Sequence, residues 1–445
     1  MHLLTRAMIV RGWKAPELAL RICNLGKERH VHVGTGKDGV YRWERGREPD
    51  QPTQYLIAEL LDIPADTVGQ YPWPRWLALD PLQQPTHHSW DAPGAIQTLD
   101  EVSGEENMTM QRRHFTQLTG VALTGSLWAW LTADPAAAGQ ITQGHRLGEA
   151  AVAHIEERVR QLRHADDIDG GGQLLAETST SQQMLVHLLK DRTYTDAHGA
   201  RLHAAAADLT RMHAWALFDL QDVCADALFN SALHSAHASG DPALGSHILA
   251  FWSIAANNSG RPADAEEMTA AALSASRGRS THRVEAMLLS RRARARAHQN
   301  NPAALTDLDR AADLLTTADR HAGEDPEWVG WFDQAELLGA QASTHLDLGQ
   351  PAHAEQLFSQ TAALFPDDRI RTRSLFLARE ADAQWRQADP ERACATAHRA
   401  LDLTEEISSH RAVGPLRDLA TSMRTHTAIP AVRDLRERIN ATVAA

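Results

Sequence analysis

A proline that recurs at the start of helical segments is the feature that most constrains how this chain can fold. Pro262, Pro302, Pro351 and Pro390 each open an alanine-rich segment, and the intervals between them are 40, 49 and 39 residues. Proline is tolerated in the first turn of a helix because the amide that it lacks would have no partner there. A helical pattern also precedes each proline, so this part of the chain predicts stacked helix pairs.

The expected pairs can be placed by their apolar periodicity. The helices before the four prolines are predicted over residues 244–257, 283–298, 328–348 and 371–387. Three of the prolines are followed at the third residue by an alanine whose small side chain lets two helices approach: Ala265, Ala354 and Ala393. We also predict pairs at 201–220 with 222–238 and at 415–423 with 430–439, and an amphipathic helix at 145–162.

Composition supports an all-α protein. Hydrophobic residues make up 43% of the chain, and few β-branched runs interrupt its alanine- and leucine-rich segments. No apolar run reaches the length of about 18 residues that a spanning helix needs, so no membrane contact is expected. Cys23, Cys224 and Cys394 are far apart, which argues against a zinc site or a disulfide and favours a reducing cytoplasm.

Residues 34–49 predict one short helix with two different faces. Thr35 is placed to cap its start with a side-chain hydroxyl, and Gly46 to end it. Val40 and Trp43 are three residues apart and share a face, so we expect them to point inward. Lys37, Tyr41 and Arg42 are then expected to point outward, an arrangement typical of a recognition helix.

The charge of the chain is unevenly distributed. The first 50 residues contain ten Lys or Arg and six Asp or Glu, a net charge of +4, although the whole chain carries −13. Residues 51–110 contain one Arg and nine acidic residues, a net charge of −8. A basic head on an acidic chain is what a localised nucleic-acid contact requires.

Four short helices are expected in this head, over residues 3–12, 15–22, 34–49 and 52–61. Together with the pattern Val40-x-Arg42-Trp43-Glu44-x-Gly46-x-x-Pro49, they resemble the helix-turn-helix domain of the lambda-repressor/Cro family. The connection between the second and third helices is longer than in that family. The resemblance implies that Lys37, Tyr41 and Arg42 face bases in the major groove of double-stranded DNA. It also implies phosphate contacts from Arg45, Arg47 and the backbone amides of Thr35 and Gly36.

The order of segments resembles that of tetratricopeptide-containing transcriptional regulators of actinobacteria such as Streptomyces, and of peptide-pheromone receptors. The resemblance implies a regulator that reads DNA, with a peptide, a small molecule or a protein bound in the groove of the repeats. Control of secondary metabolism or development is implied in the same way. A homodimer is expected because a single small head buries too little DNA for specific binding. The alternative is a tetratricopeptide-type interaction scaffold without specific DNA binding. The expected parts are a helix-turn-helix domain at 1–71, a linker at 72–110, a helical connecting region at 111–198 and repeats at 199–445.

Two connecting segments require separate interpretation. Residues 72–110 are rich in proline and acidic residues and are interpreted as an unpacked linker. Residues 111–139 resemble a twin-arginine export signal, with Arg112-Arg113 before an apolar stretch and Ala136-Ala137-Ala138 after it. Because export signals act at a free N-terminus, we favour an amphipathic helix that packs on the following domain.

No catalytic constellation is found, so we expect no enzyme activity and no cofactor. Gly34-Thr35-Gly36-Lys37 resembles the end of a phosphate-binding loop, but Val31 stands at the place of the first glycine and Asp38 follows the lysine. The stretch from Asp166 to Gly172 predicts a solvated helix terminus, with cation binding as the alternative. His234 and His237 share a helix face and are interpreted as surface residues.

Overall fold

The computed structural model divides the chain into two compact units, residues 1–88 with 118–129 and residues 89–117 with 130–445. It describes residues 4, 7, 8, 13–31, 33–44, 47–61, 63, 65, 68, 73, 74, 76, 77, 88–103, 127, 130, 147–169, 171–221, 225–320, 325–362, 364, 365, 369–404 and 410–444. Within these residues every regular element is a helix, as the composition predicts. None of these helices is both long enough and apolar enough to cross a membrane.

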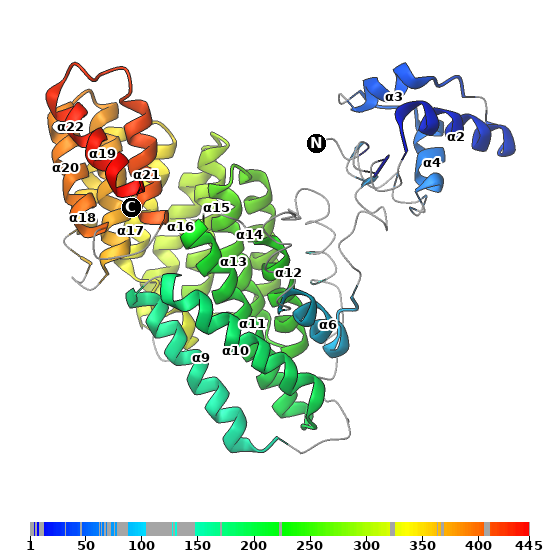
Figure 1. Cartoon of the computed structure of the whole chain (residues 1–445), viewed down its shortest axis with the longest axis horizontal. Coiled ribbons are helices and arrows are strands. Elements are labelled where there is room, and N and C mark those ends of the chain that lie inside the picture. The colour runs from blue at the N-terminus through cyan, green and yellow to red at the C-terminus, as the bar shows by residue number, and fades with distance from the viewer. Residues whose placement is uncertain are drawn as a thin grey trace. The chain divides into compact units, whose positions relative to one another are not determined.

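The first unit, which we call the head, is a small helical domain. It contains α2 (Ala15–Glu28), α3 (Lys37–Glu44) and α4 (Gln51–Leu60), with α2 packed against both others (Figure 1). Of the helix expected at 3–12, the described residues Leu4, Ala7 and Met8 are helical and buried in the hydrophobic core of the head.

Helix α2 is longer than the sequence predicts. Gly26 lies in its last turn, although the helix was expected to span only residues 15–22. The carbonyl of Gly26 accepts a hydrogen bond from the amide of Val31 at 2.8 Å. A Cβ atom at Gly26 would lie 2.9 Å from the carbonyl oxygen of Val31. The glycine therefore lets the chain fold back closely against the end of its own helix.

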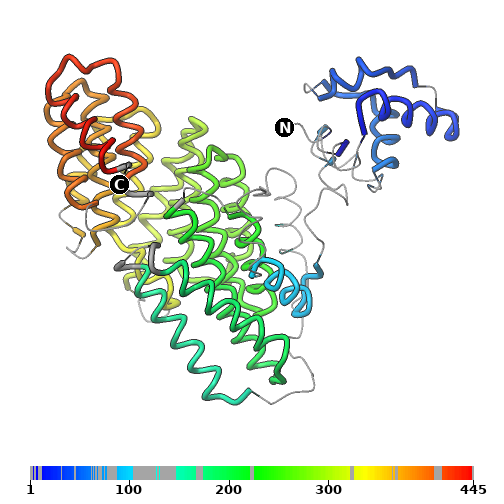
Figure 2. The backbone as a smooth tube through the Cα atoms, in the orientation of Figure 1, coloured from blue at the N-terminus to red at the C-terminus, as the bar shows by residue number. Residues whose placement is uncertain are grey.

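The helix pairs predicted from the prolines are confirmed, and we call them the array (Figures 1 and 2). Their first helices are α11 (Asp196–Gln221), α13 (Pro242–Asn258), α15 (His282–His298), α17 (Gln334–Asp347), α19 (Ile370–Arg386) and α21 (His410–Ser422). Their second helices are α12 (Asp226–Ser239), α14 (Pro262–Ser276), α16 (Ala303–Ala318), α18 (Pro351–Ala362), α20 (Pro390–Thr404) and α22 (Pro430–Ala444). Each first helix packs on its second helix and on the first helix of the next pair, which makes an α-solenoid.

Two expected boundaries in the array differ. The helix expected at 328–348 is divided into a short 3₁₀ helix, η3 (Glu327–Val329), and α17. The carboxylate of Asp333 accepts a hydrogen bond from the amide of Glu336 at 3.0 Å and so starts a new helix. Pro415 was expected to start a helix but lies inside α21.

One turn recurs between the helices of four pairs and explains the recurring proline. The residue two positions before each proline has a positive φ, namely Gly260 at 74°, Asn300 at 54°, Gly349 at 74° and Ala388 at 60°. The residue after it donates its amide back into the preceding helix, for example Arg261 to Ala256 at 2.9 Å and Gln350 to His345 at 2.9 Å. This is the six-to-one bond that ends a helix, and the proline then opens the next one.

The two ends of the array meet. Helix α11 of the first pair contacts α21 of the last pair. Arg371 of α19 lies 3.4 Å from the carboxylate of Asp166 and 3.3 Å from that of Asp219. Asp166 belongs to α9 (Glu149–Asp169), which precedes α10 (Gly171–Asp191). The prediction that Asp166 lies in a solvated terminus is therefore wrong, because this carboxylate is buried against a guanidinium from another repeat.

Part of the expected linker is packed. Residues 92–103 form α6 (Ala92–Ser103), which packs on α10 and α12. Trp90, just before it, stacks on His234 with ring centroids 3.7 Å apart and meets the edge of His237 at 5.6 Å. Both histidines are buried, so their interpretation as surface residues is also wrong.

At the other end of the expected linker, Trp76 and Leu77 are fully buried in the core of the head. The export-like stretch at 111–139 lies outside the described residues except for Leu127 and Trp130, which are helical and buried. Trp130 packs directly on Gly245 of α13, where a Cβ atom would lie 2.4 Å from the indole ring.

Candidate ligand cavity and nucleic-acid interface

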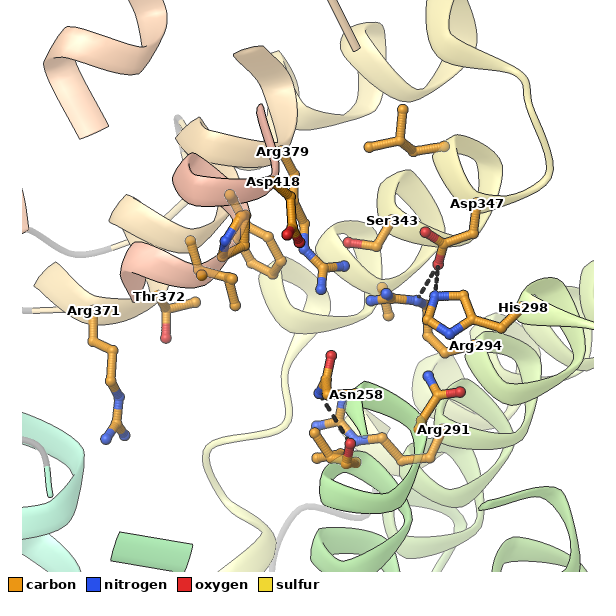
Figure 3. Close-up of a pocket in the computed structure, with 18 of the residues that line it drawn as sticks. Asn258, Arg291, Arg294, His298, Ser343, Asp347, Arg371, Thr372, Arg379 and Asp418 are labelled. Carbon is orange, nitrogen blue, oxygen red and sulfur yellow. Dashed lines mark hydrogen bonds and ion pairs between the residues drawn. The ribbon is translucent and has the colours of Figure 1, made fainter. Parts of the chain in front are cut away.

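The array contains a partly open cavity of about 790 Å³, to which all six first helices contribute. Residues at helical spacing line it, such as Arg291, Arg294 and His298 on α15 and Ser343 and Asp347 on α17 (Figure 3). Its volume lies in the range of about 300–1,000 Å³ that is usual for small-molecule sites. The sequence predicts a groove in the repeats, but it does not identify these residues.

A group of charged residues lies on one wall of the cavity. The Oδ2 atom of Asp347 accepts from Nε of Arg294 at 2.7 Å and lies 3.1 Å from Nε2 of His298. Burial alone would raise the pKa of Asp347, but Arg294, His298 and Arg379 hold it well below its usual range. Asp347 is therefore ionised. No cluster of three or more potential metal-ligating side chains was found among the described residues.

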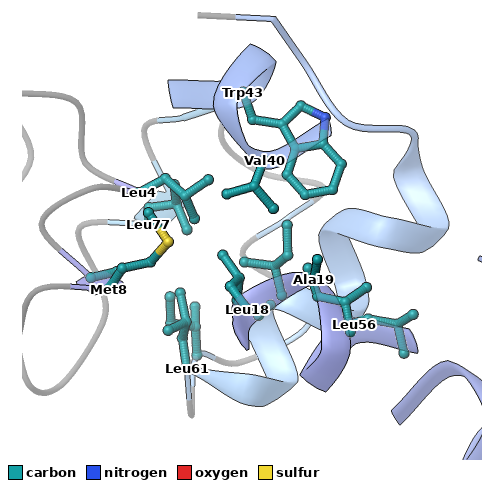
Figure 4. Close-up of a cluster of buried hydrophobic side chains, with 14 of the residues drawn as sticks. Leu4, Met8, Leu18, Ala19, Val40, Trp43, Leu56, Leu61 and Leu77 are labelled. Carbon is teal, nitrogen blue, oxygen red and sulfur yellow. The ribbon is translucent and has the colours of Figure 1, made fainter. Parts of the chain in front are cut away.

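The head presents the second candidate site, on α3. Val40 is fully buried and Trp43 is 8% exposed, and both side chains point into the core that Leu18 and Leu4 help to form (Figure 4). Tyr41 is 45% exposed, and Lys37 and Arg42 are exposed beside it. The predicted division of the helix into an inner and an outer face is confirmed.

The start of α3 differs from the prediction in one respect. The hydroxyl of Thr35 caps no amide within the described residues; instead the carbonyl of Gly36 accepts the first bond of the helix, from Gly39 at 2.9 Å. The predicted side-chain cap is therefore wrong. The backbone amides of Thr35 and Gly36 donate to no described residue, so both remain available at the N-terminus of the helix.

The end of α3 is closed by the backbone. The amide of Arg47 donates to the carbonyl of Arg42 at 3.0 Å, the bond expected where a glycine ends a helix. The Arg47 side chain is exposed, whereas Arg45 and Gly46 lie outside the described residues. Arg42 uses its Nε to bond the carbonyl of Asp38 at 3.3 Å.

Buried and half-buried polar contacts fix the segments on either side of α3. The thiol of Cys23 on α2 donates to the carbonyl of Thr35 at 3.3 Å. Gln54 of α4 donates to the carbonyl of Pro49 at 2.9 Å and accepts from the indole of Trp76 at 3.0 Å. The connection between α2 and α3 is thus long but firmly attached to α2. Gln54 was not predicted, because a single glutamine in an amphipathic helix gives no signal of its own.

The first part of the chain matches a known family. Residues 4–64 match the model of the family described as the SP15 N-terminal domain. This stretch contains α2, α3 and α4 in full. No curated protein and no solved structure matches the chain.

Proposed function

We propose that this protein is a sequence-specific DNA-binding transcriptional regulator in which α3 enters the major groove. The observation that carries the proposal is the pair of faces on α3. Val40 and Trp43 anchor the helix, and Lys37, Tyr41 and Arg42 extend together from the opposite side. Arginine on guanine is the commonest specific contact in the major groove.

Phosphate contacts would position this helix. The amides of Thr35 and Gly36 have no partner among the described residues, and a helix N-terminus attracts anions. Arg47 is exposed just beyond the other end, and Arg45 belongs to the same proposed set. The net charge of +4 in the first 50 residues supports the same orientation toward DNA.

The proposed regulator is a homodimer whose array binds an effector. One small head buries little DNA surface, and two heads on one operator supply the rest. The cavity of about 790 Å³ is the proposed effector site, for a peptide, a small molecule or a segment of a protein.

Replacing Arg42 tests the DNA-binding proposal. Genomic fragments retained by the purified chain would be sequenced to define an operator, and its affinity for the chain and for Arg42→Ala would be compared. We expect the variant to lose about 1–3 kcal/mol of binding free energy and to relax specificity at one position of the operator.

Arg433→Ala is the matched control. Arg433 lies on α22 and is 57% exposed, and its replacement also removes one positive charge. Operator affinity unchanged in Arg42→Ala would contradict the assignment of α3. Retention of DNA that does not weaken between about 50 mM and 200 mM salt would contradict phosphate contacts altogether. Absent DNA binding would favour an interaction scaffold instead.

A further inference from the structure

Two polar groups in the wall of the array cavity are buried without a hydrogen-bond partner among the residues that the structure describes. The hydroxyl of Ser343 belongs to a fully buried side chain, and Oδ1 of Asn257 belongs to a residue that is 8% exposed. Both residues line the cavity, from α17 and α13. Buried polar groups in folded proteins are almost always paired, so a pair of unsatisfied atoms facing one space indicates a missing partner.

Arg294 contributes a third group with unused capacity. Only its Nε is bonded, to Asp347, and neither terminal nitrogen donates to any described residue. Asp347 is shared between Arg294 and His298, so one carboxylate serves two basic side chains. Figure 3 shows Arg294 and Ser343 directed toward the same open space, with Arg379 extending into it from α19.

Two other acidic residues of the lining are already paired with arginines, Asp166 with Arg371 and Asp382 with Arg386 at 2.8 Å. The terminal fork of an arginine matches the two oxygens of a carboxylate, and such charge-assisted bonds are the strong ones.

The aromatic part of the wall is continuous with these groups. Phe251 packs against Trp215 at 4.7 Å between ring centroids and against Trp331 at 6.2 Å. The guanidinium of Arg291 lies 5.3 Å from the centroid of Trp331. An apolar surface therefore adjoins the polar groups, as in most small-molecule sites.

We propose that the array cavity binds an acidic ligand that carries a carboxylate and a neighbouring amide group. The carboxylate occupies the terminal nitrogens of Arg294, Ser343 and Asn257 bond the amide, and an apolar group rests on Phe251 and Trp331. The C-terminus of a short peptide and an N-acylated amino acid both have this chemistry. The proposal that the ligand binds rests on the cavity alone, whereas the role of this ligand as the effector rests on the proposed function.

The test uses the full chain and two pairs of probes. One pair is a pool of random tripeptides with a free C-terminal carboxylate and the same pool with a C-terminal amide. The other is N-acetylphenylalanine and its C-terminal amide. Binding is measured by the change in tryptophan fluorescence and by calorimetry. We expect the carboxylate form of at least one pair to bind about tenfold or more tightly than its amide.

The variants locate the site. Arg294→Gln combined with Asp347→Asn removes the ion pair without leaving a buried charge, and it should abolish the preference for the carboxylate. Ser343→Leu fills the space and should weaken both forms of each probe, whereas Arg433→Gln should change nothing. Should the double variant fail to fold, the preference of the natural chain and the effect of Ser343→Leu still decide the question.

Equal binding of the acid and amide forms, or no saturable binding of either acid, would overturn the proposal. Tighter binding of N-acetylphenylalanine than of the tripeptides identifies a small-molecule ligand, and the reverse order identifies a peptide C-terminus. A gel-shift titration of the operator is run separately. Ligand binding without DNA binding would refute only the proposed function, and DNA binding without ligand binding would refute only this inference.

Discussion

At the scale of single residues, the recurring turn of the array offers a matched pair of substitutions. Ala388 holds a φ of 60° where two of the equivalent turns have glycine, and an L-residue costs about 1–2 kcal/mol in this left-handed conformation. Ala388→Gly should therefore raise the free energy of unfolding by about 1 kcal/mol, and Gly260→Ala should lower it by a similar amount. No atom lies within 4 Å of a Cβ at Gly260, so the backbone alone determines the effect.

Urea unfolding of both variants and of the natural chain measures the difference. Gly148 is not in a left-handed conformation and also has open space around it, so Gly148→Ala is the control for adding a methyl group. A loss of stability in Ala388→Gly would show that side-chain packing, rather than backbone strain, decides this position.

A second residue-scale prediction concerns acid stability. Burial lowers the pKa of His203 to about 4, and neither of its ring nitrogens has a hydrogen-bond partner within the described part of the chain. In the unfolded chain His203 binds a proton below about pH 6.5, whereas in the folded chain it does so only near pH 4. This residue's contribution to stability is therefore complete above about pH 6.5 and is lost as the pH falls toward 4, with about 2 kcal/mol lost at pH 5.

His203→Leu should remove this dependence. The difference in unfolding free energy between roughly pH 7 and pH 5 should be smaller in the variant by about 2 kcal/mol, measured in urea. Some dependence remains, because burial also lowers the pKa of His213 to about 4. His187→Leu is the control, since that side chain is 78% exposed. Identical pH profiles for the natural chain and His203→Leu would contradict the prediction.

At the scale of elements, the sequence predicts helices well, but it does not show whether a given proline starts a helix or belongs to a linker. In the array, proline in the first turn was interpreted as a helix start, and α14, α18 and α20 begin at that residue. Pro93 occupies the same place in α6, and the carboxylate of Asp91 caps that helix by accepting from Gly94 at 2.8 Å. It was interpreted as part of a linker because helix α6 is short and lies among other prolines. A proline is thus compatible with a helix start and with a linker, and at Pro93 only the packing of α6 on α12 decides between the two.

Of the two candidate sites, one could be predicted from the sequence and the other could not. The two faces of α3 follow from the positions of Val40 and Trp43, so local periodicity was sufficient to predict them. The cavity residues Asn257, Arg294 and Ser343 come from three helices, and periodicity does not tell which face of each helix lines the interior. Their unused hydrogen-bonding groups become visible only when the pairs are stacked.

Helix α6 gives a prediction of its own. Trp90 stacks on His234, Lys190 bonds Asp100 at 2.9 Å, and Ser231 bonds Thr98 at 3.2 Å. Trp90→Ala removes the largest of these contacts, and because Trp90 is only half-buried it should cost less than the about 3–5 kcal/mol of a fully buried aromatic side chain. Because α6 is a short element at the edge of the array, we expect local release of residues 92–103 and not global unfolding.

Hydrogen exchange measured by mass spectrometry distinguishes these outcomes. Amides of α6 should exchange faster in Trp90→Ala, while those of α15 and α17 keep their protection. Lys190→Gln serves as the comparison, because its ion pair is 43% exposed on the lysine side and contributes little. Unchanged exchange in α6 would show that the helix is held without Trp90.

At the scale of the array, closure of its two ends depends on few side chains. Arg371 joins α19 to α9 and α11, and its Nη2 also donates to the carbonyl of Asp166 at 3.2 Å. Asp219 is fully buried and Asp166 is 6% exposed. Arg371→Met keeps the aliphatic length of the side chain but leaves two buried carboxylates without this cation. Removing one partner of a buried ion pair costs about 3–5 kcal/mol.

The location of that loss distinguishes closure from general stability. If Arg371 closes the array, Arg371→Met should speed hydrogen exchange at the C-terminal end of α11 and the N-terminal end of α19, while α14 and α16 stay protected. The melting temperature should fall as well, and Arg433→Met, which alters an exposed arginine of α22, should change neither quantity. A uniform increase in exchange along all pairs would mean that the array unfolds as one cooperative unit. Since Arg371 also lines the cavity, a ligand that fills the cavity should slow exchange at the same two helix ends in the natural chain.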